Sequence, residues 1–103
     1  MTAIIVSPVA EGDLATITDF YLAEAGIEIA SAFLTAWDRC MEHLSGFPAS
    51  RSLRLAEKLA IGGLRVWPIK GFPQLALYLE TPLGITIQRV LHSARDLPFA
   101  LRD

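Results

Sequence analysis

The spacing of apolar residues changes once along this chain of 103 residues, near Gly63. Before Gly63, apolar residues recur every three or four positions, as they do on one face of a helix; after it, they alternate with polar residues, as in a strand. A chain of this length can bury one core, so we expect a single domain over residues 1–103. Helices followed by strands predict an α+β fold.

The first half predicts a short strand and two helices. Residues 4–6 are β-branched, and Ser7 and Pro8 are the residue types favoured at a helix N-cap and first position. Gly26 ends the first helix and Gly46 the second, and the short link at Gly26 predicts an antiparallel helical hairpin. The apolar stripes are Leu14, Ile17, Tyr21 and Ala25 on the first helix, and Ala30, Phe33, Leu34, Trp37, Met41 and Leu44 on the second.

The second half predicts a three-stranded antiparallel meander. Strand-like runs cover residues 64–67, 75–79 and 85–91, and the links between them contain proline and glycine. Pro68 lacks the N–H that a central strand needs, so the first of these strands should lie at a sheet edge or have a bulge at Pro68, and the third is favoured for the centre. Residues 49–62 fit either a short helix or an irregular crossover, and a short C-terminal helix is expected within residues 94–103.

Composition predicts a folded protein that leaves apolar surface for a partner. Hydrophobic residues make up 52% of the chain, and its mean hydropathy is +0.42. No uninterrupted apolar run approaches roughly 18 residues, and the N-terminus lacks the pattern of a signal peptide, so we expect a cytoplasmic protein without membrane contact. The single cysteine, Cys40, lies among apolar residues; we expect it to be buried, and we expect no disulfide, metal site or cofactor.

Charge is distributed unevenly along the sequence. Residues 1–50 contain seven acidic residues and only Arg39 as a base, whereas residues 51–103 contain eight basic and four acidic residues. Two interpretations remain open: two separately solvated surfaces, or a basic face that meets an acidic partner.

The chemistry-bearing residues form no recognisable catalytic motif. The only histidines are His43 and His92, no glycine-rich phosphate loop is present, and the strand half has no carboxylate pair spaced for acid–base catalysis. What remains are basic residues on or beside strands, accompanied by Trp67 and His92: Arg65, Lys70, Arg89 and Arg95. Strand alternation places Arg65 with Trp67 on one face, and places Ile85, Ile87, Arg89 and Leu91 together on a face of another strand. The arginines are either surface residues, with Arg95 in an ion pair, or half-buried residues that bind an anion or several carbonyl oxygens.

Three segments resemble the strand motifs of ParE-like toxins of the RelE/ParE superfamily: residues 63–69, 71–73 and 85–97. The most specific part is the run Arg-Val-Leu-His-Ser-Ala-Arg-Asp at 89–96. The opening at residues 7–17 is also similar. The resemblance implies a strand, a helical hairpin, an antiparallel meander and a short C-terminal element.

In function, the resemblance implies the toxin of a type II toxin–antitoxin system of the kind that stabilises plasmids. Its partner would be a ParD-like antitoxin in a hetero-oligomer, with DNA contacted only indirectly through that antitoxin. Its target would be DNA gyrase.

RelE-like relatives of this group instead cleave messenger RNA, with basic residues and a tyrosine or histidine near the C-terminus. Here no residue after Arg95 provides such an acid or base, so we expect a toxin that is not an enzyme. A ribosome-dependent RelE-type endonuclease, and an inactive member that only binds antitoxin, are the alternatives. The residues expected to bind the target or partner are Arg65, Trp67, Arg89, His92, Arg95, Asp96, Phe99 and Leu101.

Overall fold

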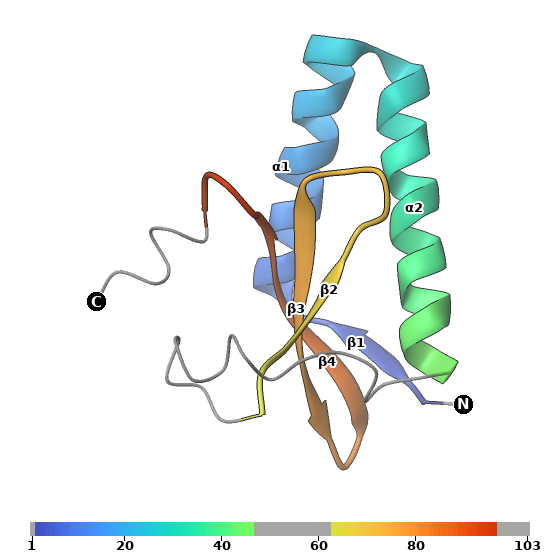
Figure 1. The fold of residues 1–103 in the computed structure, drawn as a ribbon, viewed down its shortest axis with the longest axis vertical. Coiled ribbons are helices and arrows are strands. Elements are labelled where there is room, and N and C mark those ends of the chain that lie inside the picture. The colour runs from blue at the N-terminus through green and yellow to red at the C-terminus, as the bar shows by residue number, and fades with distance from the viewer. Residues whose placement is uncertain (1, 47–62, 97–103) are drawn as a thin grey trace.

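A helical hairpin and a four-stranded sheet make up the described part of the chain, residues 2–46 and 63–96, in the computed structural model (Figure 1). The elements in order are β1 (Ile4–Val6), α1 (Pro8–Ala25), α2 (Ile27–Gly46), β2 (Arg65–Pro68), β3 (Gln74–Thr81) and β4 (Gly84–His92). The predicted α+β class and the order of these elements are confirmed. The expectations for residues 49–62, and for a C-terminal helix beyond residue 96, lie outside the described residues.

The helices begin and end at the residues from which their ends were predicted. The Ser7 hydroxyl oxygen accepts a hydrogen bond from the Ala10 N–H at 3.1 Å, and Pro8 opens α1. Gly26, with φ of 93°, donates its N–H to the Tyr21 carbonyl oxygen at 3.0 Å. Because Gly26 alone separates the two helices, they run antiparallel as a hairpin (Figure 1).

The sheet has the strand order β1-β4-β3-β2. β3 pairs antiparallel with both β2 and β4, which confirms the meander, and Pro68 lies in an edge strand as predicted. β1 pairs in parallel with β4, with Ile4 opposite Ile85. The sequence pattern predicted the strand at residues 4–6 but not this pairing, which makes β4 a central strand.

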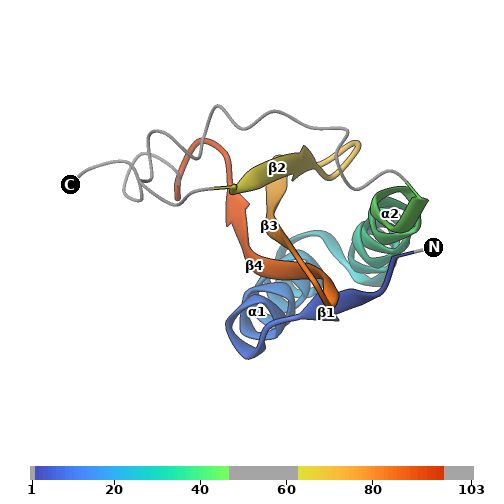
Figure 2. The same ribbon diagram turned by 90° about the horizontal axis from the view of Figure 1, so that it is seen from below.

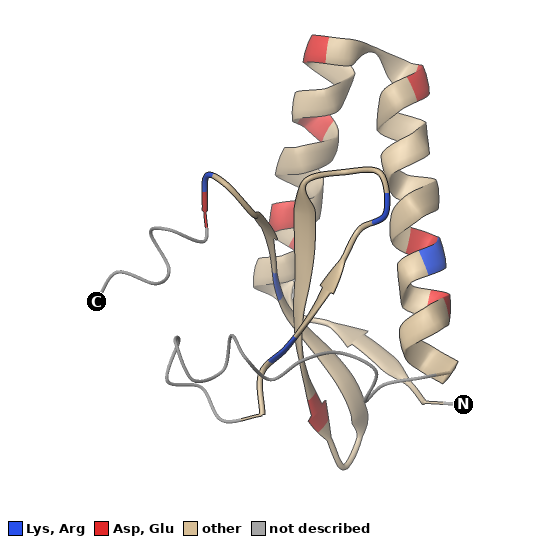
Figure 3. Cartoon of the chain, viewed as in Figure 1, with Lys and Arg blue, Asp and Glu red and all other residues tan. Residues whose placement is uncertain are grey.

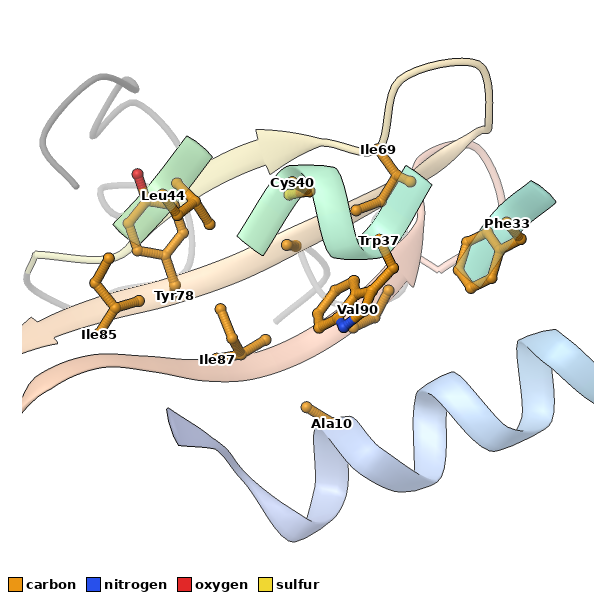
Figure 4. Close-up of a cluster of buried hydrophobic side chains, with 11 residues drawn as sticks. Ala10, Phe33, Trp37, Cys40, Leu44, Ile69, Tyr78, Ile85, Ile87 and Val90 are labelled. Atoms are coloured by element: carbon orange, nitrogen blue, oxygen red, sulfur yellow. The ribbon is translucent and has the colours of Figure 1, made fainter. Parts of the chain in front are cut away.

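The main core lies between the hairpin and one face of the curved sheet (Figure 2). Figure 4 shows α2 directing Phe33, Trp37, Cys40 and Leu44 toward the strands. The buried residues of this core are Ala10, Phe33, Trp37, Cys40, Leu44, Ile69, Ala76, Tyr78, Ile85, Ile87 and Val90. The predicted stripe of α2 is wrong at Leu34, which is 42% exposed because it lies about 100° around the helix from Phe33.

A β-bulge interrupts the pairing of β3 with β4. Tyr78 pairs with Ile87 and Leu77 pairs with Arg89, so Gln88 is an extra residue in β4. Val90 rather than Arg89 therefore enters the helix-side core. The neighbouring Leu91 joins a second buried cluster with Leu64 and Leu77. The prediction that Arg89 and Leu91 continue the face of Ile85 and Ile87 is wrong, because the bulge shifts the alternation by one residue.

We expect Gly84→Ala to destabilise the fold by about 1–3 kcal/mol. Gly84 has φ of 136°, and a Cβ there would collide with the backbone of Ala3, whose carbonyl oxygen accepts the Ile85 N–H at 2.9 Å. Thermal denaturation measures the loss. The matched control is Gly12→Ala in α1, where an added Cβ meets no atom within 4 Å and alanine favours the helix. Equal melting temperatures for the two variants would contradict this account.

Candidate functional site

The predicted site residues separate into two groups in the structure. Arg89, His92, Arg95 and Asp96 lie at and beyond the end of β4, where a hollow forms beside α1. Arg65 and Trp67 lie on β2, which is separated from β4 by β3. Phe99 and Leu101 lie outside the described residues. The constellation predicted from the sequence is therefore two surfaces rather than one.

The first surface, called here the arginine pocket, is a hollow of about 540 Å³ lined by Asp13, Thr16, Ile17, Arg89, Val90, Leu91, Arg95 and Asp96. The Asp13 carboxylate accepts hydrogen bonds from Arg89 Nε at 2.8 Å and from its terminal nitrogen at 3.1 Å. It also accepts the Val90 N–H at 2.9 Å. The hydrogen bond to Asp13 is the main cause that raises the pKa of Arg89, so this guanidinium is charged and held in place.

The turn after β4 positions Arg95. The His92 N–H donates to Asp96 Oδ2 at 2.7 Å, while His92 Nδ1 accepts the N–H groups of Ala94 and Arg95, both at 3.1 Å. His92 and Asp96 thus fix the backbone of this turn. Arg95 is exposed, and its guanidinium carbon lies 5.8 Å from the centre of the Phe20 ring, within the range of a cation–π contact.

The second surface, called here the α2–β2 groove, lies between α2 and the edge strand. It is a hollow of about 480 Å³ lined by Ala32, Thr35, Ala36, Arg39, Cys40, His43, Trp67, Pro68, Lys70 and Phe72. The rings of His43 and Trp67 are stacked, with centroids 4.0 Å apart. Arg65 is not among the lining residues; its Nε forms an ion pair with Glu80 at 3.0 Å.

Sequence reasoning missed Asp13, Arg39 and His43 as site residues. Arg39 and His43 stand four positions apart on α2, a spacing that puts both on one helix face, so their proximity was open to prediction. The contact of Asp13 with Arg89 joins residues 76 positions apart, and no local pattern signals it.

Neither surface contains a recognisable metal site or a reactive thiol. Within residues 2–46 and 63–96, no group of three His, Cys, Asp or Glu side chains could hold a metal ion. Cys40 is buried as predicted, and burial raises its pKa to about 12, so its thiol stays protonated at neutral pH. No helix in the described part of the chain is both long and apolar enough to cross a membrane.

The hairpin, the mixed sheet and the two hollows define a small α+β domain, and comparison with known proteins identifies its class. Its fold is similar to a solved structure titled "Chromosomal ParDE TA system from P. aeruginosa", with a TM-score of 0.75, 22% identity, and coverage of 89% of this chain and 96% of that one. No curated protein sequence matches.

Residues 4–97 match the family described as "ParE toxin of type II toxin-antitoxin system, parDE". The chain therefore belongs to the ParE toxin family of type II toxin–antitoxin systems, as its motifs predicted. Membership in such a system implies an antitoxin partner.

We expect Asp13→Ala to lower the free energy of unfolding by about 2–3 kcal/mol, because it leaves the Val90 N–H without its acceptor as well as breaking the ion pair. Arg89→Ala should cost less than about 1 kcal/mol, because the arginine side chain is 46% exposed and solvent weakens its ion pair. Thermal or urea denaturation of both variants and of the double variant measures the difference. Equal losses for the two single variants would show that the Val90 contact contributes nothing.

Proposed function

We propose that this ParE family member stops growth by binding a protein target, DNA gyrase, and that a ParD-like antitoxin neutralises it. The proposal rests on membership in the ParE family and on an arginine pocket in which Asp13 and Asp96 each accept a backbone N–H. Such a pocket supports binding rather than catalysis. A cytoplasmic location is part of this proposal, because gyrase acts there.

The hydrogen bonds near the two arginines disfavour general base chemistry. A general base must have a lone pair available to the substrate. The Nδ1 lone pair of His92 faces two backbone N–H groups, which assigns the proton of the neutral ring to Nε2. Asp13 accepts from Arg89 and Val90, and Asp96 accepts from His92. These contacts weigh against the RelE-type endonuclease alternative.

The same pocket has the residue types that dominate protein–protein contacts. Arginine and aromatic residues are enriched among the residues that carry binding energy. Arg89 is held by Asp13, and exposed Arg95 lies over Phe20, which is itself 48% exposed. A surface of arginine and aromatic side chains that is already ordered loses little conformational entropy on binding. It therefore suits a target protein with acidic groups around an apolar depression.

Apolar surface on the hairpin supports an antitoxin that covers part of the chain. The large apolar residues at least two-fifths exposed on α1 and α2 are Val9, Phe20, Leu22, Ile27, Ile29 and Leu34. A partner that covers these side chains removes them from water, and this burial stabilises the complex. Contact with operator DNA would then come through the antitoxin alone.

We expect Arg95→Ala to reduce gyrase poisoning at least tenfold. Purified gyrase, supercoiled plasmid and ATP are incubated with the toxin, and the linear DNA released from the cleaved complex is measured. The loss follows from removing the exposed guanidinium, and about tenfold corresponds to one charged contact at an interface. The control is Ser31→Asp, an equal change in charge at an exposed position of α2 outside both hollows, which should poison gyrase like the wild type.

Two outcomes would replace the proposal. Messenger RNA cut on ribosomes, together with unaffected gyrase, would establish the RelE-type activity. Antitoxin binding without growth arrest or any gyrase effect would identify an inactive member.

A further inference from the structure

The α2–β2 groove has no role in the gyrase contact proposed above, and its wall on α2 is a regular stripe. Ala32, Ala36 and His43 lie at helical spacing along this wall. The opposite wall is formed by Trp67, Pro68 and the turn that follows β2. Figure 1 shows that turn beside α2. The groove therefore opens along the α2 side of the hairpin.

The two charged residues that line the groove, Arg39 and Lys70, are both basic. Arg39 on α2 and Lys70 on the opposite turn are both exposed, and His43 stacks on Trp67 between the walls. None of the residues that line it is acidic. A ligand that enters this groove gains most if it carries negative charge.

The groove also has space and apolar surface for a polypeptide backbone. Ala32 and Ala36 have the smallest side chains on its α2 wall, so a bound chain can approach this helix closely. Phe72 adds an aromatic surface to the lining. Ile29, one helical turn before Ala32 and Phe33, is 41% exposed and extends the apolar stripe beyond the groove. The matching ligand is therefore apolar as well as anionic.

A short acidic peptide fits this surface better than a nucleic acid does. The hairpin carries seven acidic residues and only Arg39 as a base, and Figure 3 shows acidic residues along both helices. Asp38 and Glu42 are exposed on the same helix as Arg39. A long polyanion would extend from the groove onto this acidic surface and be repelled, whereas a peptide can confine its carboxylates to the groove.

We propose that the α2–β2 groove binds an acidic, apolar segment of the antitoxin, an inference that rests on the proposed function. Carboxylates of that segment pair with Arg39 and Lys70. An aliphatic or aromatic side chain of the segment packs against Trp67 and Phe72. The arginine pocket contributes nothing to this contact.

The test uses the full chain and the product of the reading frame adjacent to its gene, and measures their affinity by calorimetry. Arg39→Glu combined with Lys70→Glu is expected to weaken binding about 100-fold, or tenfold for each reversed charge. Ala32→Trp, which fills the groove, should weaken binding at least tenfold. Ala15→Trp is the matched control: it adds the same ring to an exposed alanine of α1 outside the groove, and affinity should be unchanged.

Exchanging the charges between the two partners tests whether Arg39 and Lys70 pair with carboxylates of the bound segment. Peptides from the adjacent protein are screened for binding, and the acidic residues of the binding peptide are replaced by lysine. The lysine peptide should bind the Arg39→Glu, Lys70→Glu variant at least tenfold more tightly than it binds the wild type. Melting temperatures of all variants within a few degrees of the wild type show that the changes act on binding rather than on folding.

Failure of the groove proposal and failure of the proposed function give different results. If the adjacent protein binds the wild type and both groove variants equally, the groove proposal is wrong and the antitoxin partnership stands. If the adjacent protein does not bind the wild type at all, the proposed function itself is wrong. If a short single-stranded RNA binds with the same dependence on Arg39 and Lys70 and the peptides do not, the groove is a nucleic-acid site and the proposal is overturned.

Discussion

The carboxylate of Asp13 holds the β-bulge on which both the core and the arginine pocket depend. Without the extra residue Gln88, simple alternation after Ile87 would direct Arg89 into the helix-side core, where an unpaired guanidinium is costly. The bulge sends Val90 there instead, and its N–H donates to Asp13. The same carboxylate fixes Arg89 at the surface, so one side chain of α1 sets both the register shift and the position of a charge.

The edge of β4 beyond the bulge is closed by side chains rather than by another strand. β1 ends at Val6, opposite Ile87, and within residues 2–46 and 63–96 no other strand pairs with the following backbone groups of β4 on that side. The Ser7 hydroxyl donates to the Gln88 carbonyl oxygen, and Asp96 accepts the His92 N–H. Asp13 occupies the position between them. A partner at this end of the sheet therefore meets side chains instead of a free strand edge, which favours recognition by charge and shape over strand addition.

Local sequence patterns predicted the helices and strands, whereas contacts between residues far apart in the sequence determine the candidate site. Gly26 and Pro68 act through their own backbone geometry, so the hairpin and the edge strand were predictable from the sequence. The bulge arises from the fit of α1 against β4, and its anchor lies 76 positions from Arg89, so strand alternation gave the wrong face for that arginine. Sequence patterns also could not separate Arg65 from Arg95, because the strand order that divides them is a property of the folded sheet.

The separation of the two hollows constrains how one antitoxin could neutralise the toxin. A segment confined to the α2–β2 groove would leave Arg95 and the arginine pocket accessible to the target, because β3 lies between the edge strand and β4. Under the proposed function, neutralisation therefore requires either an antitoxin segment that continues past the groove or a second part of the antitoxin placed over the end of β4. The cationic groove then contributes affinity and orientation, and the continuation supplies the inhibition.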